Sequence, residues 1–215
     1  MPTLFIATGN AHKVQEIRAV LGTEFIVLSQ KDANVRLEPE ETGATFAENA
    51  RIKSVTWAAY LATDVCDLGA DYVLADDSGL EVDALGGAPG VHSARFAALD
   101  DDRKGNSPDA ENNAKLLRLL APVPEGRRTA RFRSTLALTP VMPGASAAEM
   151  AATTRFFDGA CEGRIALAPS GQGGFGYDCL FIPEGHAVSF AELGEAIKNR
   201  HSHRAKALAR LQAGW

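Results

Sequence analysis

The sequence has no long apolar run and no excess of basic residues. No segment approaches the roughly 20 apolar residues that a membrane-spanning helix needs, and the apolar run at residues 4–7 is too short for a signal peptide. The net charge is −5, from 22 basic and 27 acidic residues, whereas non-specific binding to nucleic acids or membranes requires a basic surface. We therefore expect neither nucleic acid nor a membrane as a partner.

Cysteine is scarce. The three cysteines, Cys66, Cys161 and Cys179, are odd in number, scattered and in no metal-ligand spacing. This pattern argues against a disulfide framework or a structural zinc site. It is typical of reduced thiols that serve as small core residues, so we expect a cytoplasmic protein.

Internal repeats and low-complexity linkers are absent, and 215 residues suffice for one domain with a substantial core. We predict a single domain over residues 1–215 with two lobes. Short apolar runs predict strands at 3–7, 72–75, 129–138, about 150–163 and 180–182, and helical periodicity predicts helices at 11–21, 109–120 and about 202–212. Capping-box patterns at Thr45 and Ser189 predict two further helix starts. The mixture predicts an α/β fold with added antiparallel strands.

Two adjacent carboxylates, Asp76 and Asp77, follow the apolar run at residues 72–75. Neighbouring carboxylates repel each other unless a cation or a proton compensates them. A solvated turn with Ser78 is one interpretation. The other is a metal site that Asp77 shares with an acidic residue of the segment 38–41. Hard oxygen ligands without nearby cysteine or histidine favour Mg²⁺ or Mn²⁺ over zinc, although acidic residues before a helix also serve as ordinary capping groups.

A strand-to-helix turn forms a second candidate site. It consists of Thr8, Gly9, Asn10, Ala11, His12 and Lys13. Such a turn directs free backbone N–H groups outward at the positive end of the helix dipole, where a polyphosphate can bind. Thr8 and Asn10 add side-chain donors, and Lys13 adds a charge. The spacing of a Walker A loop is absent, and the alternative is a plain turn with a solvated Lys13.

Two later segments carry further ligand-binding chemistry. Residues 171–178 hold four glycines around Phe175, which predicts a close backbone approach and an aromatic ring for stacking on a base. The alternative is a glycine corner with Phe175 in the core. Residues 198–204 gather basic side chains near a predicted helix start, where they oppose the helix dipole. This predicts an anionic or carbonyl-rich partner, or else a solvated basic face.

These motifs closely resemble the inosine triphosphate pyrophosphatase family, also called Ham1-like proteins, over nearly the whole chain. The motifs that carry the resemblance are Thr8-Gly9-Asn10 with Lys13, Glu41-Thr42-Gly43-Ala44-Thr45-Phe46 with Lys53, Ala75-Asp76-Asp77-Ser78-Gly79-Leu80, Gly174-Phe175-Gly176-Tyr177-Asp178, and Lys198 with Ser202-His203-Arg204. The resemblance implies an elongated α/β fold with a long mixed central sheet, two lobes flanking an active-site cleft, and a homodimer. It also implies Mg²⁺-dependent hydrolysis of ITP, dITP and XTP to the monophosphate and pyrophosphate.

The resemblance further assigns roles to individual residues. Asp77 is the expected catalytic carboxylate, and it holds the metal together with Glu40 or Glu41. The expected triphosphate ligands are Thr8, Asn10, Lys13 and Lys53, and Ser78 is expected to contact the substrate. The expected base pocket comprises Phe175, Asp178, Lys198, His203 and Arg204. Gly9, Ala11, His12, Gly176 and Tyr177 complete the expected substrate-binding set.

The hypothesis that follows is attack of water at the α-phosphorus, with Asp77 positioning or deprotonating the water. Arg204 offers only hydrogen-bond donors, which favours a 6-oxo purine over adenine. The alternatives are a related pyrophosphatase for other altered or pyrimidine nucleotides and a catalytically silent nucleotide-binding module. The polar stretch at residues 100–106 receives no functional assignment, and no residue is identified that would reject GTP.

Overall fold

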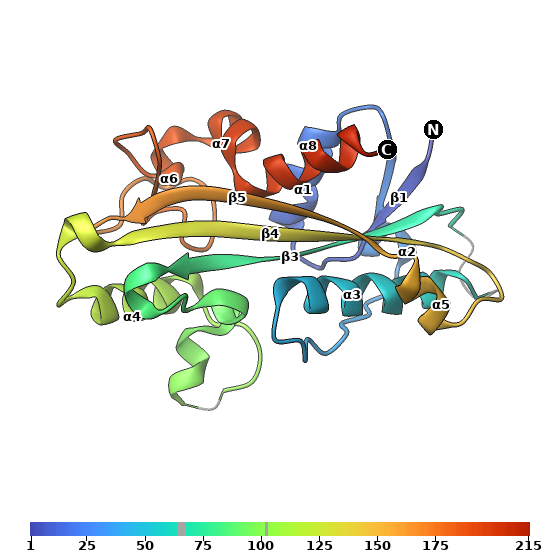
Figure 1. Ribbon diagram of the computed structural model, residues 1–215, viewed down its shortest axis with the longest axis horizontal. Helices are drawn as coiled ribbons and strands as arrows, with labels where there is room; N and C mark the ends of the chain where they lie inside the picture. The colour runs from blue at the N-terminus through green and yellow to red at the C-terminus, as the bar shows by residue number, and fades with distance from the viewer. Residues whose placement is uncertain (64–67, 102) are drawn as a thin grey trace. The chain divides into compact units, whose positions relative to one another are not determined.

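A computed structural model describes residues 1–63, 68–101 and 103–215, so Cys66 lies outside the described residues. Within these residues a six-stranded sheet has the order β2-β1-β3-β4-β5-β6 (Figure 1). The strands are β1 (Thr3–Ile6), β2 (Ile26–Ser29), β3 (Tyr72–Val82), β4 (Thr129–Pro140), β5 (Arg155–Ile165) and β6 (Phe181–Pro183). β1 pairs in parallel with β2 and β3, whereas β5 and β6 are antiparallel. The expected α/β fold with a mixed sheet is confirmed.

The described chain forms two compact units. Unit 1 comprises Met1–Asp77, Ser134–Asp158 and Ala207–Trp215, and unit 2 comprises Ser78–Arg133 and Gly159–Lys206. The expectation that both belong to one domain stays a prediction. No helix of the described chain combines the length and the apolar character needed to cross a membrane.

Unit 1 buries both faces of β1. Leu4 and Ile6 pack into the core cluster that contains Ile17 of α1 (Ala11–Leu21). The alternate residue Phe5 lies in the other cluster, where its ring centroid is 4.6 Å from that of Trp57 of α3 (Phe46–Leu61). This alternation is expected for a strand covered on both sides. The remaining helices with residues in this unit are α2 (Gln30–Ala33), α5 (Ala147–Ala152) and the later part of α8 (His203–Ala213).

Local sequence signals place two helices of unit 1 correctly. The predicted helix at residues 11–21 is α1. At the start of α3, Thr45 Oγ1 accepts a hydrogen bond from Glu48 N at 3.2 Å, and Glu48 Oε2 accepts one from Thr45 N at 3.1 Å. The predicted capping box at Thr45 is confirmed.

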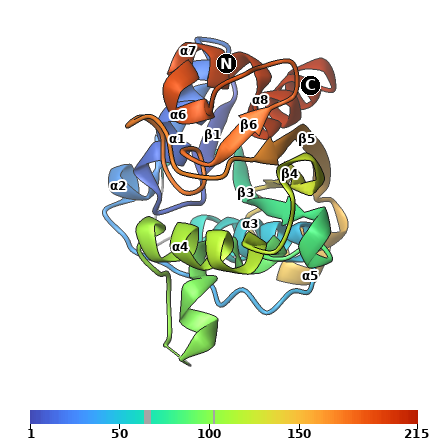
Figure 2. The same ribbon diagram turned by 90° about the vertical axis from the view of Figure 1, so that its left-hand side faces the viewer.

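Unit 2 is built around a cluster in which α4 (Asp109–Leu120) contributes Leu116 and Leu120, and the strands contribute Leu80, Phe132 and Phe181. The predicted helix at residues 109–120 is confirmed as α4 (Figure 2). The other helical elements are η1 (Asp83–Leu85), η2 (Gly90–Arg95), η3 (Ala97–Asp100), η4 (Glu125–Arg127), α6 (Phe190–Leu193) and α7 (Glu195–His201).

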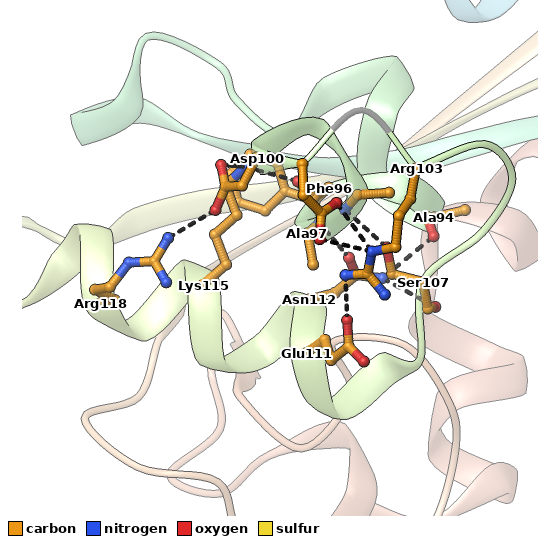
Figure 3. A network of polar contacts seen from close by, with 12 residues as sticks. Ala94, Phe96, Ala97, Asp100, Arg103, Ser107, Glu111, Asn112, Lys115 and Arg118 are labelled. Atoms are coloured by element: carbon orange, nitrogen blue, oxygen red, sulfur yellow. Dashed lines mark hydrogen bonds and ion pairs between the residues drawn. The ribbon is translucent and has the colours of Figure 1, made fainter.

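The polar stretch at residues 100–106 is tied to α4 (Figure 3). Asp100 pairs with Lys115 at 2.6 Å and with Arg118 at 2.8 Å. Arg103 pairs with Glu111 at 2.6 Å. Further hydrogen bonds of this network involve Ala94, Phe96, Ala97, Ala98, Ser107 and Asn112. Asp100 and Arg103 therefore anchor the loop to α4, and Asp102 lies outside the described residues.

Three details of the predicted elements are wrong. The segment after residue 150 is not yet strand, because Ser146 caps the helix α5 and β5 begins only at Arg155. The helix start predicted at Ser189 is confirmed, since α6 begins at Phe190, but the capping box is not formed: the Ser189 hydroxyl donates to Ser170 O at 2.9 Å. The strand predicted at residues 180–182 is displaced by one residue, as β6 covers Phe181–Pro183.

Candidate active site

Asp76 and Asp77 lie in the middle of β3 and not at its end. β1 pairs with this strand only as far as Leu74, so both carboxylates lie just past the carboxyl end of β1. The prediction of a strand end at this point was wrong because the strand continues into Leu80 and Val82, which are fully buried. The two carboxylates therefore lie inside a continuous strand, at the position where the neighbouring strand β1 has ended.

Both carboxylate oxygens of Asp76 are held by protein groups. Ser134 Oγ of β4 donates to Oδ1 at 2.6 Å. Lys13 Nζ of α1 lies 2.9 Å from Oδ2. Asp76 is 1% exposed, and its charge orients Lys13.

Asp77 belongs to a second set of contacts, which brings it together with Glu41. Lys53 Nζ of α3 lies 2.8 Å from Asp77 Oδ1 and 3.2 Å from Glu41 Oε1. Asn49 Nδ2, one helical turn before Lys53, donates to Asp77 Oδ2 at 3.4 Å. Glu40 is exposed, whereas Glu41 is half-buried. The geometry thus favours Glu41 over Glu40 as the partner of Asp77.

The lysine–carboxylate cluster of Lys13, Lys53, Glu41, Asp76 and Asp77 has an excess of negative charge. Two lysines face three carboxylates, which leaves one net negative charge. Burial and the charge of Glu41 raise the pKa of Asp77 above its ordinary value, although Lys53 and Lys13 lower it. Burial alone would lower the pKa of Lys53, but Asp77 and Glu41 raise it above its ordinary value. Both groups therefore hold their protons more tightly than in water, so the cluster favours additional positive charge.

This cluster suits a hard divalent cation. Glu41 and Asp77 supply carboxylate oxygens that converge on one ammonium group. Among the described residues, no three histidine, cysteine, aspartate or glutamate side chains gather into a metal-binding group. Mg²⁺ commonly binds through one or two carboxylates, with substrate phosphates and water completing its shell. Two carboxylates therefore suit a Mg²⁺ ion that shares its ligands with a substrate and water, and they are too few for a metal site built from protein ligands alone.

The turn at residues 8–13 differs from the expectation in one respect. Asn10 is the N-cap of α1, and its Oδ1 accepts hydrogen bonds from His12 N at 2.9 Å and Lys13 N at 3.2 Å. Asn10 N in turn donates to Thr8 Oγ1 at 3.2 Å. The backbone N–H groups of His12 and Lys13 are therefore not free, and the prediction was wrong for these two. Gly9, Ala11 and the side chain of His12 lie exposed on the turn.

Unit 2 contains a separate set of candidate residues in the glycine loop at residues 174–178. Asp178 Oδ2 accepts a hydrogen bond from Phe175 N at 2.9 Å and lies 2.5 Å from Lys198 Nζ. This Nζ also lies 4.1 Å from the ring centroid of the half-buried Phe175. Gly174 has a φ of +75°, and a Cβ at this position would meet Asp178 Oδ2 at 2.2 Å. The loop therefore requires glycine here.

Tyr177 belongs to the core of this unit. Its side chain is 3% exposed, and its hydroxyl donates to Ser93 O at 2.9 Å. Burial raises the pKa of this hydroxyl far above its ordinary value. Tyr177 therefore anchors the loop, and it presents no exposed surface to a ligand.

The basic segment divides between two helices. Lys198, Arg200 and His201 occupy the last turn of α7, where positive charge complements the helix dipole. The predicted helix start is confirmed, because His203 and Arg204 begin α8. The expectation that the preceding basic residues oppose a helix dipole was wrong for these three. Arg204 is 2% exposed, and its guanidinium donates to Ser78 Oγ at 3.0 Å. The ring of His203 stacks on Phe132, with centroids 4.9 Å apart.

Asn49 and Ser134 contact the carboxylate pair but are not among the predicted site residues. Asn49 precedes Lys53 by four residues, a spacing that places both on one helix face. A polar residue at a buried strand position was the available signal for Ser134. Neither signal predicts that these side chains contact Asp77 and Asp76.

The protein thus combines a mixed α/β sheet with a lysine–carboxylate cluster suited to a hard divalent cation. The chain belongs to the Ham1 family, whose model matches residues 4–214. It is 45% identical to a dITP/XTP pyrophosphatase of Geobacillus kaustophilus, covering 100% of this chain and 95% of the relative. It is 43% identical to a dITP/XTP pyrophosphatase of Xylella fastidiosa, covering 99% of this chain and 96% of that relative.

Solved structures show the same fold. The Ham1 protein of Staphylococcus aureus is 33% identical, with a TM-score of 0.77 over 98% of this chain and 96% of the other. A nucleoside-triphosphatase / dITP/XTP pyrophosphatase of Mycobacterium abscessus is 36% identical, with a TM-score of 0.70 over 97% of this chain and 98% of the other.

Proposed function

We propose that this protein is a nucleoside-triphosphate pyrophosphatase that hydrolyses dITP, ITP and XTP to the monophosphate and pyrophosphate. The proposal is supported by membership of the Ham1 family and by full-length relatives that carry the name dITP/XTP pyrophosphatase. The observation that carries it is the sharing of Lys53 by Asp77 and Glu41, at 2.8 and 3.2 Å. Its physiological role would be to remove altered purine nucleotides from the nucleotide pool.

The lysine–carboxylate cluster is assigned to the triphosphate. A triphosphate is strongly anionic, and the cluster already carries one net negative charge. Binding therefore requires a cation, which we assign to Mg²⁺ held by Asp77 and Glu41. When bound, Mg²⁺ would withdraw charge from the phosphates and lower the pKa of the attacking water. Lys13 and Lys53 would neutralise charge on the departing pyrophosphate.

Asp77 is assigned as the general base. Water attacks the α-phosphorus in line with the departing pyrophosphate, and Asp77 holds or accepts the proton of this water. Burial raises the pKa of Asp77, which makes its carboxylate a stronger base than an exposed aspartate. Thr8 and Asn10, on the exposed turn before α1, are assigned to phosphate oxygens.

The residues of unit 2 are assigned to the base. Phe175 would stack on the purine, beside Asp178 and Lys198. Arg204 is buried and has only donors to offer, so it would pair with a 6-oxo group and be left unpaired by the 6-amino group of adenine. An unpaired buried partner costs about 1–3 kcal/mol, which corresponds to roughly 5- to 150-fold discrimination against ATP.

The direct test is pyrophosphate release from ITP, dITP and XTP with Mg²⁺, with ATP, GTP and UTP as comparison substrates. We expect turnover of the first three, much slower turnover of ATP, and loss of turnover when EDTA removes the metal. Activity confined to pyrimidine triphosphates would contradict the assigned substrate class. Absence of turnover on every triphosphate, with Mg²⁺ and with Mn²⁺, would refute the enzyme assignment for this chain.

A further inference from the structure

Helix α4 holds the backbone of the glycine loop from two positions. Gly176 N donates to Asp109 Oδ2 at 2.6 Å, and Asn113 Nδ2 donates to Gly176 O at 2.8 Å. Asp109 and Asn113 are four residues apart, so they lie on one face of α4. The N–H and the C=O of a single loop residue are thus both fixed by one helix, and we call this pair the Gly176 clamp.

The clamp acts directly next to Phe175. The amide of Phe175 is held by Asp178 at 2.9 Å, and the following residue, Gly176, has a left-handed φ of +62°. Glycine in this conformation has little conformational preference of its own. The contacts that Asp109 and Asn113 make to Gly176 therefore help to fix the direction in which the chain leaves Phe175, together with the hydrogen bond from Asp178 N to Phe175 O at 3.2 Å.

Packing alone does not account for Asn113. It precedes Leu116 and Leu120 by three and seven residues, which places it on the apolar stripe of α4, and it is 7% exposed. Among the described residues its Oδ1 is buried and has no hydrogen-bond partner. An unpaired buried amide oxygen is unfavourable, and such a group calls for an explanation. A leucine would avoid that cost but could not donate to Gly176.

We propose that Asp109 and Asn113 are positioning residues for base recognition: through Gly176 they fix the orientation of Phe175 and Asp178. Neither residue needs to touch the nucleotide. The inference rests on the proposed function, because it gives the clamp its role in binding a purine. The Gly176 clamp should therefore affect KM and the discrimination between bases. The chemical step, carried out by the lysine–carboxylate cluster, should not depend on it.

The test compares Asn113→Leu with the wild-type protein, using ITP and ATP as substrates. Loss of the hydrogen bond should raise KM for ITP about five- to tenfold, with kcat nearly unchanged. The preference for ITP over ATP should fall as well. The melting temperature should change little, because the variant removes the unpaired oxygen together with the hydrogen bond to Gly176 O. Ala114→Leu places leucine at the neighbouring, exposed position and should leave both KM and kcat unchanged.

Asp109 supplies the second arm of the test. Asp109→Ala should raise KM for ITP, whereas Asp109→Asn keeps an acceptor oxygen and should restore much of the wild-type value. Hydrogen exchange of the Gly176 amide should be faster in Asp109→Ala than in the wild type. Unchanged KM and discrimination in both Asn113→Leu and Asp109→Ala, in an active enzyme, would overturn the positioning role. A wild-type protein without turnover of ITP would instead overturn the proposed function, and the role of the clamp with it.

Discussion

Replacing Asp77 by asparagine tests the assignment of the general base. The substitution keeps the shape of a side chain that is 9% exposed and removes its charge. Lys53 would retain Glu41 Oε1 at 3.2 Å and the backbone oxygen of Asp76 at 3.0 Å. Its ammonium is therefore not left without partners, and we expect the variant to fold.

The expected loss is in turnover. A positioned general base contributes typically about 10²–10⁴ in rate, or roughly 3–5 kcal/mol of transition-state stabilisation. We therefore expect kcat for ITP to fall at least about 100-fold in Asp77→Asn. Binding of ITP should survive, because both lysines remain and the lysine–carboxylate cluster loses its net negative charge, which offsets the loss of one carboxylate ligand to Mg²⁺.

The assay is pyrophosphate release under saturating ITP and Mg²⁺, combined with titration calorimetry of ITP on the variant. Asp76→Asn is the matched control, since it makes the same change one residue earlier. Asp76 contacts Ser134 at 2.6 Å and Lys13 at 2.9 Å, so its loss should raise KM more than it lowers kcat. Near-normal turnover in Asp77→Asn, or an equal loss of kcat in Asp76→Asn, would refute the assignment.

Three further outcomes are expected. Gly174→Ala should lower the free energy of unfolding by at least about 1 kcal/mol, because its Cβ would lie 2.2 Å from Asp178 Oδ2; a wild-type melting curve would contradict this. Burial raises the pKa of the Cys161 thiol to about 11, so only about 0.1% is thiolate at pH 8. Ellman's reagent should label Cys161 at least about 100-fold more slowly in the native than in the unfolded protein, and rapid native labelling would show that it is accessible. The homodimer implied by the family resemblance predicts twice the monomer mass in light scattering, and a monomer mass at micromolar concentration would contradict it.

Helices were predicted well where the signal is local. The bounds of α1 and α4 follow from apolar periodicity, and the start of α3 follows from the reciprocal pair of Thr45 and Glu48. Each of these signals acts within one or two helical turns. The early end assigned to β3 shows the limit, because two carboxylates normally mark the end of a buried strand. Here they stay within the strand because Lys13 and Lys53, from two different helices, compensate them.

The candidate site follows the same division. Motif chemistry indicated Asp77 and a nearby glutamate, and the family resemblance added Lys53. Sequence reasoning could not choose between Glu40 and Glu41, because that choice depends on which side chain reaches Lys53 in space. Ser134 is separated from Asp76 by 58 residues, so only the pairing of strands reveals the contact.

The requirement for glycine at position 174 has a consequence for altering the substrate range of this protein by directed evolution. Any residue other than glycine at position 174 would place its Cβ against the Asp178 carboxylate. Variants with a substitution at this position are therefore expected to misfold. Phe175 is half-buried, and its ring is not confined in this way. A library that keeps Gly174, Gly176 and the buried Arg204 fixed and varies Phe175 would therefore sample new base preferences while most of its members still fold.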